Sequence, residues 1–381
     1  MILILDVQSS VVRGSLVLMT LSAKPIVVFT HNSNIPGKAQ FDVNYLIKTT
    51  LAAVGETISS AEKYLNILKH EKTLKPLPHK ISAIHYALLS PWIVSKAKVM
   101  SIDFDKKTKI SSQYISGIIE KERSKMLPKS DEPIELIEQK IFDVRLNGYS
   151  VSEWENRETD RLEVSFAVSM AGVRMIESFV RECRGVVSQS HVHFHSSLLL
   201  QQIGLNKIGL GDGNYALLHI HGEITDVSVI DHESCIFFGS YPFGVNTLLR
   251  QISAQTGNDL KASDSMLTLY TGGRLDSSHG RKTIEMIDEL CQAWAKEFQN
   301  ILSAVKINLL PPSSIIFSAW AHDDCFGSVL GKTFTGPKII LLSIDKFLPV
   351  VNFEFHSERR RLTALYALAI HSMKGFSSVL K

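Results

Sequence analysis

Five histidines occupy positions whose spacing could bring their imidazole rings together. His191, His193 and His195 alternate along one short segment, and His219 and His221 alternate along another. Alternate residues of a strand point to the same face of its sheet, and imidazole nitrogens are good zinc ligands. The spacing leaves three interpretations open: a metal site built from these residues, a site that neutralises an anion such as phosphate, or polar strand faces with solvated or hydrogen-bonded rings.

Two serines next to the first histidine group raise the question of nucleophilic catalysis. Ser196 and Ser197 directly follow His195, and a serine beside a base is one requirement for an activated nucleophile. The sequence has no G-x-S-x-G turn, however, and no acid is placed to orient the base. These residues therefore do not indicate a hydrolase.

One local pattern occurs in both halves of the chain. An apolar strand, a turn of small and polar residues and a second apolar strand occupy residues 2–21, and the pattern returns at residues 217–238. Residues 216–230 and 234–238 are predicted to form a strand pair around a turn at 231–233. No tandem period accompanies the two copies, which indicates a distant duplication and not a solenoid.

The second copy resembles the second phosphate loop of the actin-like superfamily, in the branch that holds the cell-division protein FtsA and the pilus-assembly protein PilM. That loop reads approximately D-I-G-G-E-x-T-D-V-S-V, and after a turn F-x-x-S-x-P-x-G-x-N-T. This chain has HIHGEITDVSVIDHESCIFFGSYPFGVNT at residues 219–247. The matching positions are Gly222, Glu223, Thr225, Asp226, Val227, Phe238, Ser240, Pro242, Gly244, Asn246 and Thr247.

Two further segments are similar to the same family. Residues 6–13, DVQSSVVR, resemble its first phosphate loop, D-x-G-S-x-x-[IV]-[KR], and residues 87–95, ALLSPWIVS, resemble the strand that leads into its inserted subdomain 1C. The resemblance implies an α/β, two-lobed, actin-like fold of the duplicated ribonuclease H-like type. It also implies an inserted 1C (SHS2-type) α+β module.

The sequence between the two parts of lobe I has its own rhythm of strand, helix, strand and strand over about 85 residues, which suffices for a small α+β module. Continuous decoration of the first domain is the alternative. The predicted layout is lobe I subdomain 1A at 1–82 and 169–208, the 1C-like module at 83–168, lobe II subdomain 2A at 209–250 and 312–381 with a C-terminal helix, and a 2B-like subdomain at 251–311.

The resemblance implies a nucleotide site between the lobes. Small residues let backbone N–H groups approach phosphate oxygens, hydroxyls add donors, and acids at the head of each loop hold Mg²⁺ through water. The family's adenosine motif, a glycine triplet after a buried strand, falls at residues 318–320. The implied ligands are ATP and Mg²⁺, with Asp6 at the metal. The implied nucleotide contacts are Asp6, Gln8, Ser9, Ser10, Gly222, Glu223, Thr225, Asp226, Ser318 and Trp320.

Several of these positions depart from the family pattern. Gln8 replaces the glycine of the first loop, His219 replaces the acid of the second, and His221 replaces its first glycine. An imidazole cannot replace a carboxylate as a hard Mg²⁺ ligand. Trp320 is bulky where a base must lie against backbone. These departures predict weak or lost ATPase activity.

The composition is that of an ordinary globular chain. Of 381 residues, 45% are hydrophobic and 21% are charged, which permits more than one core. The net charge is +3 and aromatics are not interleaved with basic residues, so no nucleic-acid partner is expected. The four cysteines show no CxxC spacing. They indicate free thiols in a reducing cytoplasm and neither a zinc ribbon nor a disulfide framework.

Neither end of the chain predicts a membrane segment. The opening MILILDVQSS lacks the features of a signal peptide, and no run of about 18 apolar residues occurs. Residues 373–381 are too short for the amphipathic membrane helix of FtsA relatives. The basic run at 358–361 is expected to be a solvated helix start, with contact to acidic lipid or to a partner as the alternative. We expect a cytoplasmic protein that reaches the inner membrane only through a partner.

The functional prediction combines the family resemblance with its departures. It is a cytosolic scaffold of the FtsA/PilM type that assembles with itself or with an envelope-complex partner in cell division or type IV pilus biogenesis. The alternative is a working ATP-binding and ATP-hydrolysing switch that cycles between open and closed lobes.

Overall fold

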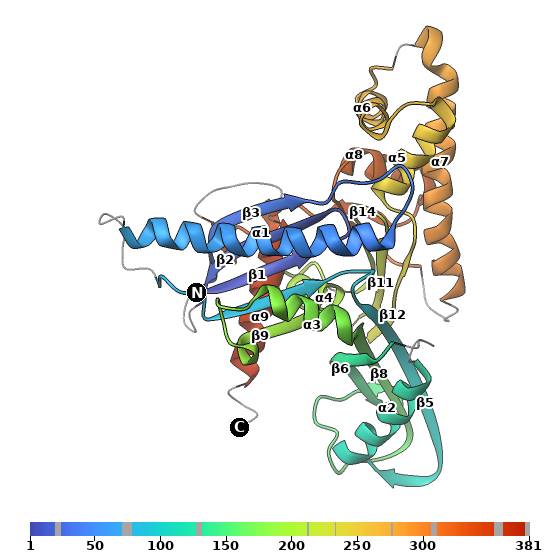
Figure 1. Ribbon diagram of the computed structural model, residues 1–381. Helices are drawn as coiled ribbons and strands as arrows, with labels where there is room; N and C mark the ends of the chain where they lie inside the picture. The colour runs from blue at the N-terminus through green and yellow to red at the C-terminus, as the bar shows by residue number, and fades with distance from the viewer. Residues whose placement is uncertain are drawn as a thin grey trace.

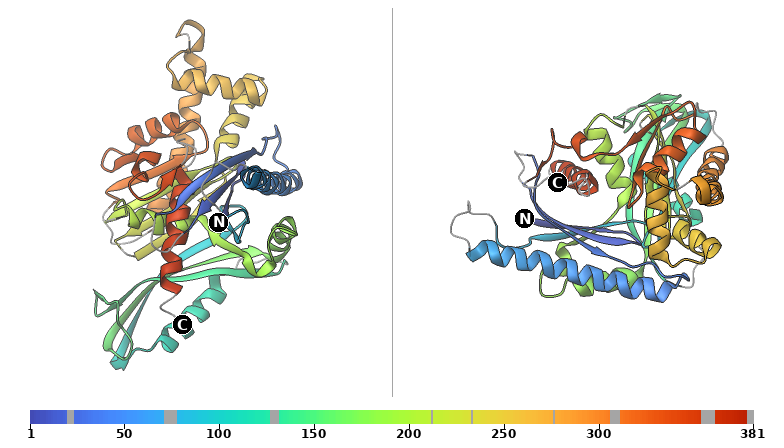
Figure 2. Two further views of the ribbon diagram at one scale, coloured as in Figure 1. Left: turned by 90° about the vertical axis from the view of Figure 1, so that its left-hand side faces the viewer. Right: turned by 90° about the horizontal axis from the view of Figure 1, so that it is seen from above.

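The computed structural model contains two large sheets and one small sheet, with helices on their faces (Figures 1 and 2). It describes residues 1–19, 24–70, 78–126, 132–211, 213–232, 234–275, 277–305, 311–353 and 361–377. The residues at 358–360 and 378–381, which belong to the basic run and the C-terminal tail considered above, lie outside these ranges. Among the described helices, none is both long and apolar enough to cross a membrane.

The first sheet has six strands in the order β15-β3-β2-β1-β4-β9. Its central strand, ILILDV, is apolar over most of its length and buried on both faces, as expected for a strand covered from two sides. The strands are β1 (Ile2–Val7), β2 (Val11–Leu18), β3 (Ile26–Asn34), β4 (Ala83–Leu88), β9 (Val192–Ser196) and β15 (Asn352–Phe353).

The second sheet has five strands in the order β12-β11-β10-β13-β14. Its strands are β10 (Asn214–Ile220), β11 (Thr225–Asp231), β12 (Ser234–Tyr241), β13 (Ser314–Ala319) and β14 (Lys338–Leu341). The strand predicted at residues 216–230 is therefore two strands, because the chain turns at 221–224 as well as near 232. The polar and small residues of HGE interrupt the apolar run at that turn.

The two sheets repeat one topology. In the first, β1 pairs antiparallel with β2 and parallel with β4; in the second, β10 pairs antiparallel with β11 and parallel with β13. In each, a third antiparallel strand follows (β3 or β12) and a further parallel strand closes the other side (β9 or β14). This repetition confirms the predicted two-lobed, duplicated α/β architecture.

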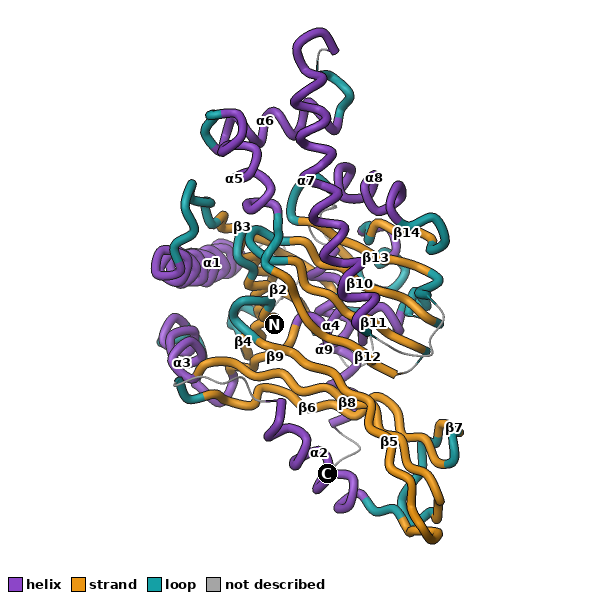
Figure 3. Tube along the Cα trace, turned by 90° about the vertical axis from the view of Figure 1, so that its right-hand side faces the viewer, coloured by secondary structure: helices purple, strands orange, loops and turns teal. Residues whose placement is uncertain are grey.

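The small sheet is separate from the two lobe sheets but packs against both lobes; it lies below them in Figure 1 and follows the order β5-β8-β6-β7 (Figure 3). Its elements are β5 (Val94–Lys109), α2 (Ser112–Met126), β6 (Ile134–Leu146), β7 (Tyr149–Ser150) and β8 (Glu158–Gly172). Buried side chains of these elements form a core of their own, with Phe166 and Ile119 among its fully buried members. We call this unit the small module; its identity as a 1C subdomain remains a prediction.

Helices cover the outer faces of the lobes and fill the space between them. The core of lobe I joins β1 to α1 and α3, and the core of lobe II joins β10 to α5, α7 and α8. A third core lies between the sheets and contains α4 and α9. The helices are α1 (Val43–His70), α3 (Val173–Glu182), α4 (Ser197–Lys207), α5 (Val245–Thr256), α6 (Leu260–Thr271), α7 (Ser277–Ala304), α8 (Asp323–Thr333) and α9 (Arg361–Ser377).

Candidate functional site

Two equivalent turns of the two lobes meet at the centre of the molecule. The first loop (residues 8–10) joins β1 to β2, and the second loop (residues 221–224) joins β10 to β11. Each is closed by the same backbone hydrogen bond: Gln8 N–H donates to Val11 O at 3.0 Å, and His221 N–H donates to Ile224 O at 3.1 Å. The duplication therefore makes residue 8 equivalent to residue 221.

The strand register extends this equivalence to charged residues. Asp6 faces Arg13 across the first hairpin, and His219 faces Asp226 across the second. Lobe I thus carries an acid on the incoming strand and a base on the outgoing strand. Lobe II has the reverse order, so the two hairpins are chemically complementary and not identical.

Asp6 is engaged on both carboxylate oxygens. Its Oδ2 accepts hydrogen bonds from Gln8 Nε2 at 2.8 Å and from Arg13 Nη1 at 3.2 Å, and its Oδ1 accepts one from Tyr366 Oη of α9 at 3.4 Å. All four side chains are buried. Burial raises the pKa of Asp6, and the Arg13 charge and the two hydrogen bonds to Oδ2 act against that rise. Arg13 is therefore the counter-ion of Asp6.

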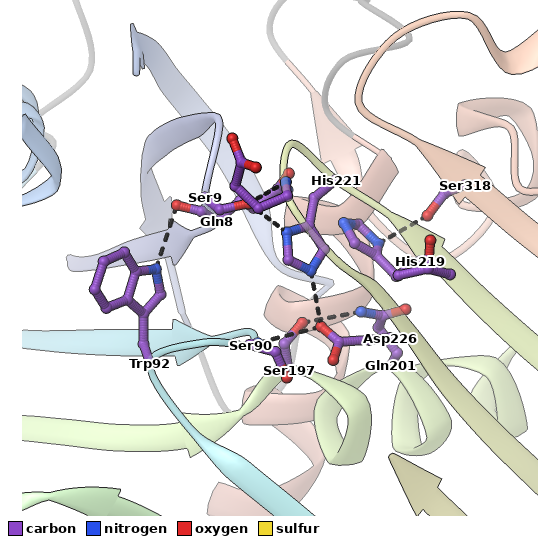
Figure 4. A network of polar contacts seen from close by, with 12 residues as sticks. Gln8, Ser9, Ser90, Trp92, Ser197, Gln201, His219, His221, Asp226 and Ser318 are labelled. Atoms are coloured by element: carbon purple, nitrogen blue, oxygen red, sulfur yellow. Dashed lines mark hydrogen bonds and ion pairs between the residues drawn. The ribbon is translucent and has the colours of Figure 1, made fainter. Parts of the chain in front are cut away.

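His221 links the two lobes directly (Figure 4). Its Nε2 lies 3.0 Å from Oδ2 of Asp226, and its Nδ1 lies 2.8 Å from Oγ of Ser9. A carboxylate only accepts, so Nε2 carries the proton and Nδ1 accepts from the Ser9 hydroxyl. The backbone N–H of Glu223 donates to the same Ser9 oxygen at 2.9 Å. We call these contacts between Ser9, His221, Glu223 and Asp226 the interlobe latch.

The other acid of the second loop is also occupied. Glu223 forms a two-pronged ion pair with the Arg250 guanidinium, and Asn246 Nδ2 donates to its Oε1 at 2.8 Å. Thr225 turns into lobe II, where its hydroxyl donates to Phe243 O at 2.6 Å and accepts from Trp294 Nε1 at 3.0 Å. Neither side chain is directed to a ligand between the loops.

The residues present do not fit a Mg–ATP complex in this conformation. A β-carbon added to Gly222 would lie 2.7 Å from Cβ of Ser10, so the two loops are already in contact. The donors that would hold phosphate, Ser9 Oγ–H and Glu223 N–H, are used in the latch, and Asp6 is paired with Arg13. Of the two first-loop hydroxyls, that of Ser10 has no hydrogen-bond partner in the described structure.

The residues at the expected adenosine position belong to lobe II. Ser318, at the end of β13, is hydrogen-bonded through Oγ to His219 Nδ1 at 2.9 Å. Trp320 packs at the edge of the lobe II core, and its backbone N–H donates to Ile220 O at 2.8 Å. The bulk of Trp320 therefore contributes to packing in lobe II, which weakens the sequence argument that it blocks a base.

The five histidines do not come together as one metal site. His195 Nε2 lies 3.0 Å from Nδ1 of His85, and its Nδ1 lies 2.8 Å from Glu138 Oε1 of the small module. His219 is hydrogen-bonded to Ser318 within lobe II, and His221 belongs to the interlobe latch. Within the described ranges no group of three or more histidine, cysteine or acidic side chains could hold a metal ion. The hypothesis of a five-histidine metal site is wrong, and hydrogen-bonded imidazoles replace it.

Sequence reasoning missed several members of the central network. Arg13 was part of the first motif but was not recognised as the partner of Asp6. Ser90 N–H donates to Asp226 Oδ2 at 3.2 Å, and Trp92 Nε1 donates to Gln8 O at 3.3 Å. Only the similarity of residues 87–95 to the family could have drawn attention to Ser90 and Trp92, and nothing local marks Tyr366.

A pocket of about 480 Å³ lies where the small module meets both lobes. Its apolar lining includes Leu88, Ile93, Met126, Leu198, Phe237 and Phe238. Ser90, Asp226 and Ser240 supply polar groups. We call it the module pocket. Because Asp226 lines it, this pocket adjoins the interlobe latch.

Comparison with known proteins gives the fold a name. The chain is similar to a structure of the PilM–PilN type IV pilus biogenesis complex, with 14% identity, 98% of each chain covered and a TM-score of 0.64. It is also similar to a nucleotide-free diol dehydratase-reactivating factor, with 8% identity, 98% of this chain and 100% of that chain covered, and a TM-score of 0.52. No family model and no curated protein matches the sequence. At these identities the likeness establishes the actin-like fold.

Proposed function

We propose that this actin-like protein is a scaffold of the FtsA/PilM type with weak or lost ATPase activity. The interlobe latch carries the proposal, because Ser9 and His221 bind each other where nucleotide phosphates bind in the family. Lobe closure then needs no ligand. The scaffold assembles with itself or with an envelope-complex partner, and the similarity to a PilM–PilN complex favours type IV pilus biogenesis over cell division.

The second candidate is an ATP-driven switch. One observation favours it: the Ser10 hydroxyl is buried at the loop contact without a hydrogen-bond partner in the described structure. A buried hydroxyl without a partner is costly, and a phosphate oxygen would satisfy it. This candidate requires the latch to break so that the loops separate.

The deciding experiment is nucleotide binding by the purified protein. A ligand that binds only the folded state raises the melting temperature once its concentration exceeds Kd. With millimolar ATP and Mg²⁺, the scaffold proposal expects the same melting temperature as in an EDTA control, and no retained ATP in equilibrium dialysis. A Mg²⁺-dependent rise, together with phosphate release, would instead establish the switch.

We further propose that the module pocket receives a segment of the partner. Its lining is mainly apolar and it lies between three structural units, which suits a short extended segment. The partner is the PilN-type inner-membrane protein of the same cell. Ser240 is exposed at the pocket, so Ser240→Trp should block co-purification of that protein, whereas Val99→Trp, on the exposed face of β5, should not.

A further inference from the structure

One short segment contacts the module pocket, the first loop and Asp226 of the interlobe latch. Residues 89–93 follow β4, and Leu89, Ser90 and Ile93 line the pocket. Within the same segment, Ser90 N–H donates to Asp226 Oδ2 at 3.2 Å and Trp92 Nε1 donates to the Gln8 carbonyl at 3.3 Å. The segment therefore contacts Asp226 of β11, just after the second loop, through Ser90, and the first loop through Trp92, as Figure 4 shows.

Asp226 is the shared group between pocket and latch. A single oxygen, Oδ2, accepts from Ser90 N–H and from His221 Nε2. Asp226 lines the pocket, and its cross-strand neighbour is the pocket residue Ser240. A hydrogen-bond donor that enters the pocket beside Ser90 competes for this oxygen. If Asp226 loses its present contacts, His221 is affected directly, because it is hydrogen-bonded to the same oxygen.

From His221 the connection continues to the first loop. The imidazole of His221 is fully buried. Because its Nε2–H donates to Asp226, its Nδ1 is the nitrogen that accepts from the Ser9 hydroxyl. When Asp226 is drawn away, the imidazole loses the group that orients it, and the Ser9 hydroxyl loses an aligned acceptor. Glu223 N–H then loses its fixed Ser9 partner. The latch is thus a chain of single contacts, each of which depends on the one before.

We propose that occupancy of the module pocket opens the interlobe latch through Asp226 and residues 89–93. The inference rests on the proposed function, because it adds a regulatory effect, the opening of the latch, to the pocket that is proposed to bind the partner. The effective occupant is an extended peptide segment that fills the apolar lining and presents a backbone N–H or another donor to Asp226. Partner binding then takes the place that nucleotide holds in a switch, by changing how the two loops contact each other.

The experiment fills the pocket covalently, so that no partner is needed. All four native cysteines are buried, whereas Ser240 is exposed. In Ser240→Cys, 2-aminoethyl methanethiosulfonate therefore labels one site and places an ammonium donor in the pocket, beside the cross-strand neighbour Asp226. Hydrogen exchange measured by mass spectrometry should then rise at least about tenfold for amides of the second loop, including Glu223, and for the first loop.

Two controls separate this coupling from general loosening. Tyr149→Cys carries the same label on the far tip of the small module, where Tyr149 is 78% exposed, and should leave both loops unchanged. Trp92→Phe keeps an aromatic ring but removes the donor to Gln8. In the Ser240→Cys background it should leave the label-induced rise in the second loop and reduce the rise in the first.

The outcomes are distinct. If the aminoethyl label at position 240 leaves exchange of both loops as it is in the unlabelled protein, the coupling is overturned, whether or not the partner binds. An equal rise at both loops from the Tyr149→Cys label would overturn it as well. A label-induced rise in a protein that fails to bind the PilN-type segment would keep the coupling and overturn only the assignment of the partner.

Discussion

The two hairpins have the same backbone arrangement, but the side chains that they carry differ in chemistry. Asp6 and Arg13 face each other in lobe I, and His219 and Asp226 occupy the equivalent positions in lobe II. In the first pair, the two charges form an ion pair within one hairpin. In the second, Asp226 turns to His221, and His221 reaches Ser9 of the other lobe. Two equivalent loops that could hold one ligand between them therefore bind each other instead.

Under the proposed function, this difference explains how the two loops can stay in contact without nucleotide. Phosphate oxygens accept hydrogen bonds from both lobes and so join them. Here one imidazole performs that task, since it accepts from Ser9 in lobe I while it is held by Asp226 in lobe II. The acid of the first hairpin, Asp6, does not perform this task, because Arg13 of the same hairpin neutralises it.

The largest effect is expected from the lobe I pair. Arg13→Ala leaves the Asp6 carboxylate buried without its counter-ion and should lower the free energy of unfolding by roughly 3 kcal/mol. Urea unfolding measures the change. The double variant Asp6→Asn with Arg13→Met removes both charges and should recover much of the loss. A single variant as stable as the wild type would show that the pair contributes little.

The second largest loss of stability is expected when the interlobe latch is broken at His221. His221→Ala removes the acceptor of Ser9 and one donor to Asp226, at a cost of roughly 2 kcal/mol. It should also speed hydrogen exchange of Glu223. His232→Ala is the matched control, because the His232 side chain is exposed and its ring contacts the neighbouring Asp231 and not the other lobe, as far as the structure describes the chain. Equal stability of both variants would contradict a latch at His221.

A third variant sharpens the comparison by restoring family residues. His219→Asp with His221→Gly returns an acid and a glycine to the second loop and removes the latch. Millimolar ATP with Mg²⁺ should then raise the melting temperature by about 1–3 °C. The wild type and an EDTA sample serve as controls. Absence of any rise would mean that Gln8 or another group still excludes the nucleotide.

The smallest expected effect is a pH dependence of lobe I. Burial raises the pKa of Asp6 in the folded state, so the folded protein binds more protons than the unfolded chain between the two pKa values. The wild type should therefore lose stability relative to Asp6→Asn as pH rises above about 4. Urea unfolding at several pH values tests this.

An exposed aspartate provides the control of opposite sign. The backbone N–H of Tyr45 and the Lys38 ammonium lower the pKa of Asp42. Relative to Asp42→Asn, the wild type should gain stability as pH rises through the acid range, and lose it as pH falls. The same slope for both aspartates would contradict the assignment of burial as the cause at Asp6.

The sequence predicted much of the fold because its signals are local. The strand-turn-strand pattern within residues 2–21 and the strand-helix-strand-strand order of the small module follow from periodicity within a few residues. The prediction failed where a short turn interrupts an apolar run, at residues 221–224. The residues HGE at this turn belong to the phosphate-loop motif, but the apolar strand patterns on its two sides resemble one continuous strand.

What the sequence determined by itself was the pair of hairpins, the residues that occupy them and their departures from the nucleotide-binding pattern. Only the tertiary structure decided what those residues do. Ser9 and His221 are 212 positions apart, and their contact depends on how the lobes close. The same holds for Tyr366 beside Asp6 and for the pocket beside Asp226. Local patterns are fixed by neighbours along the chain, whereas such contacts arise only from the packing of one lobe against the other.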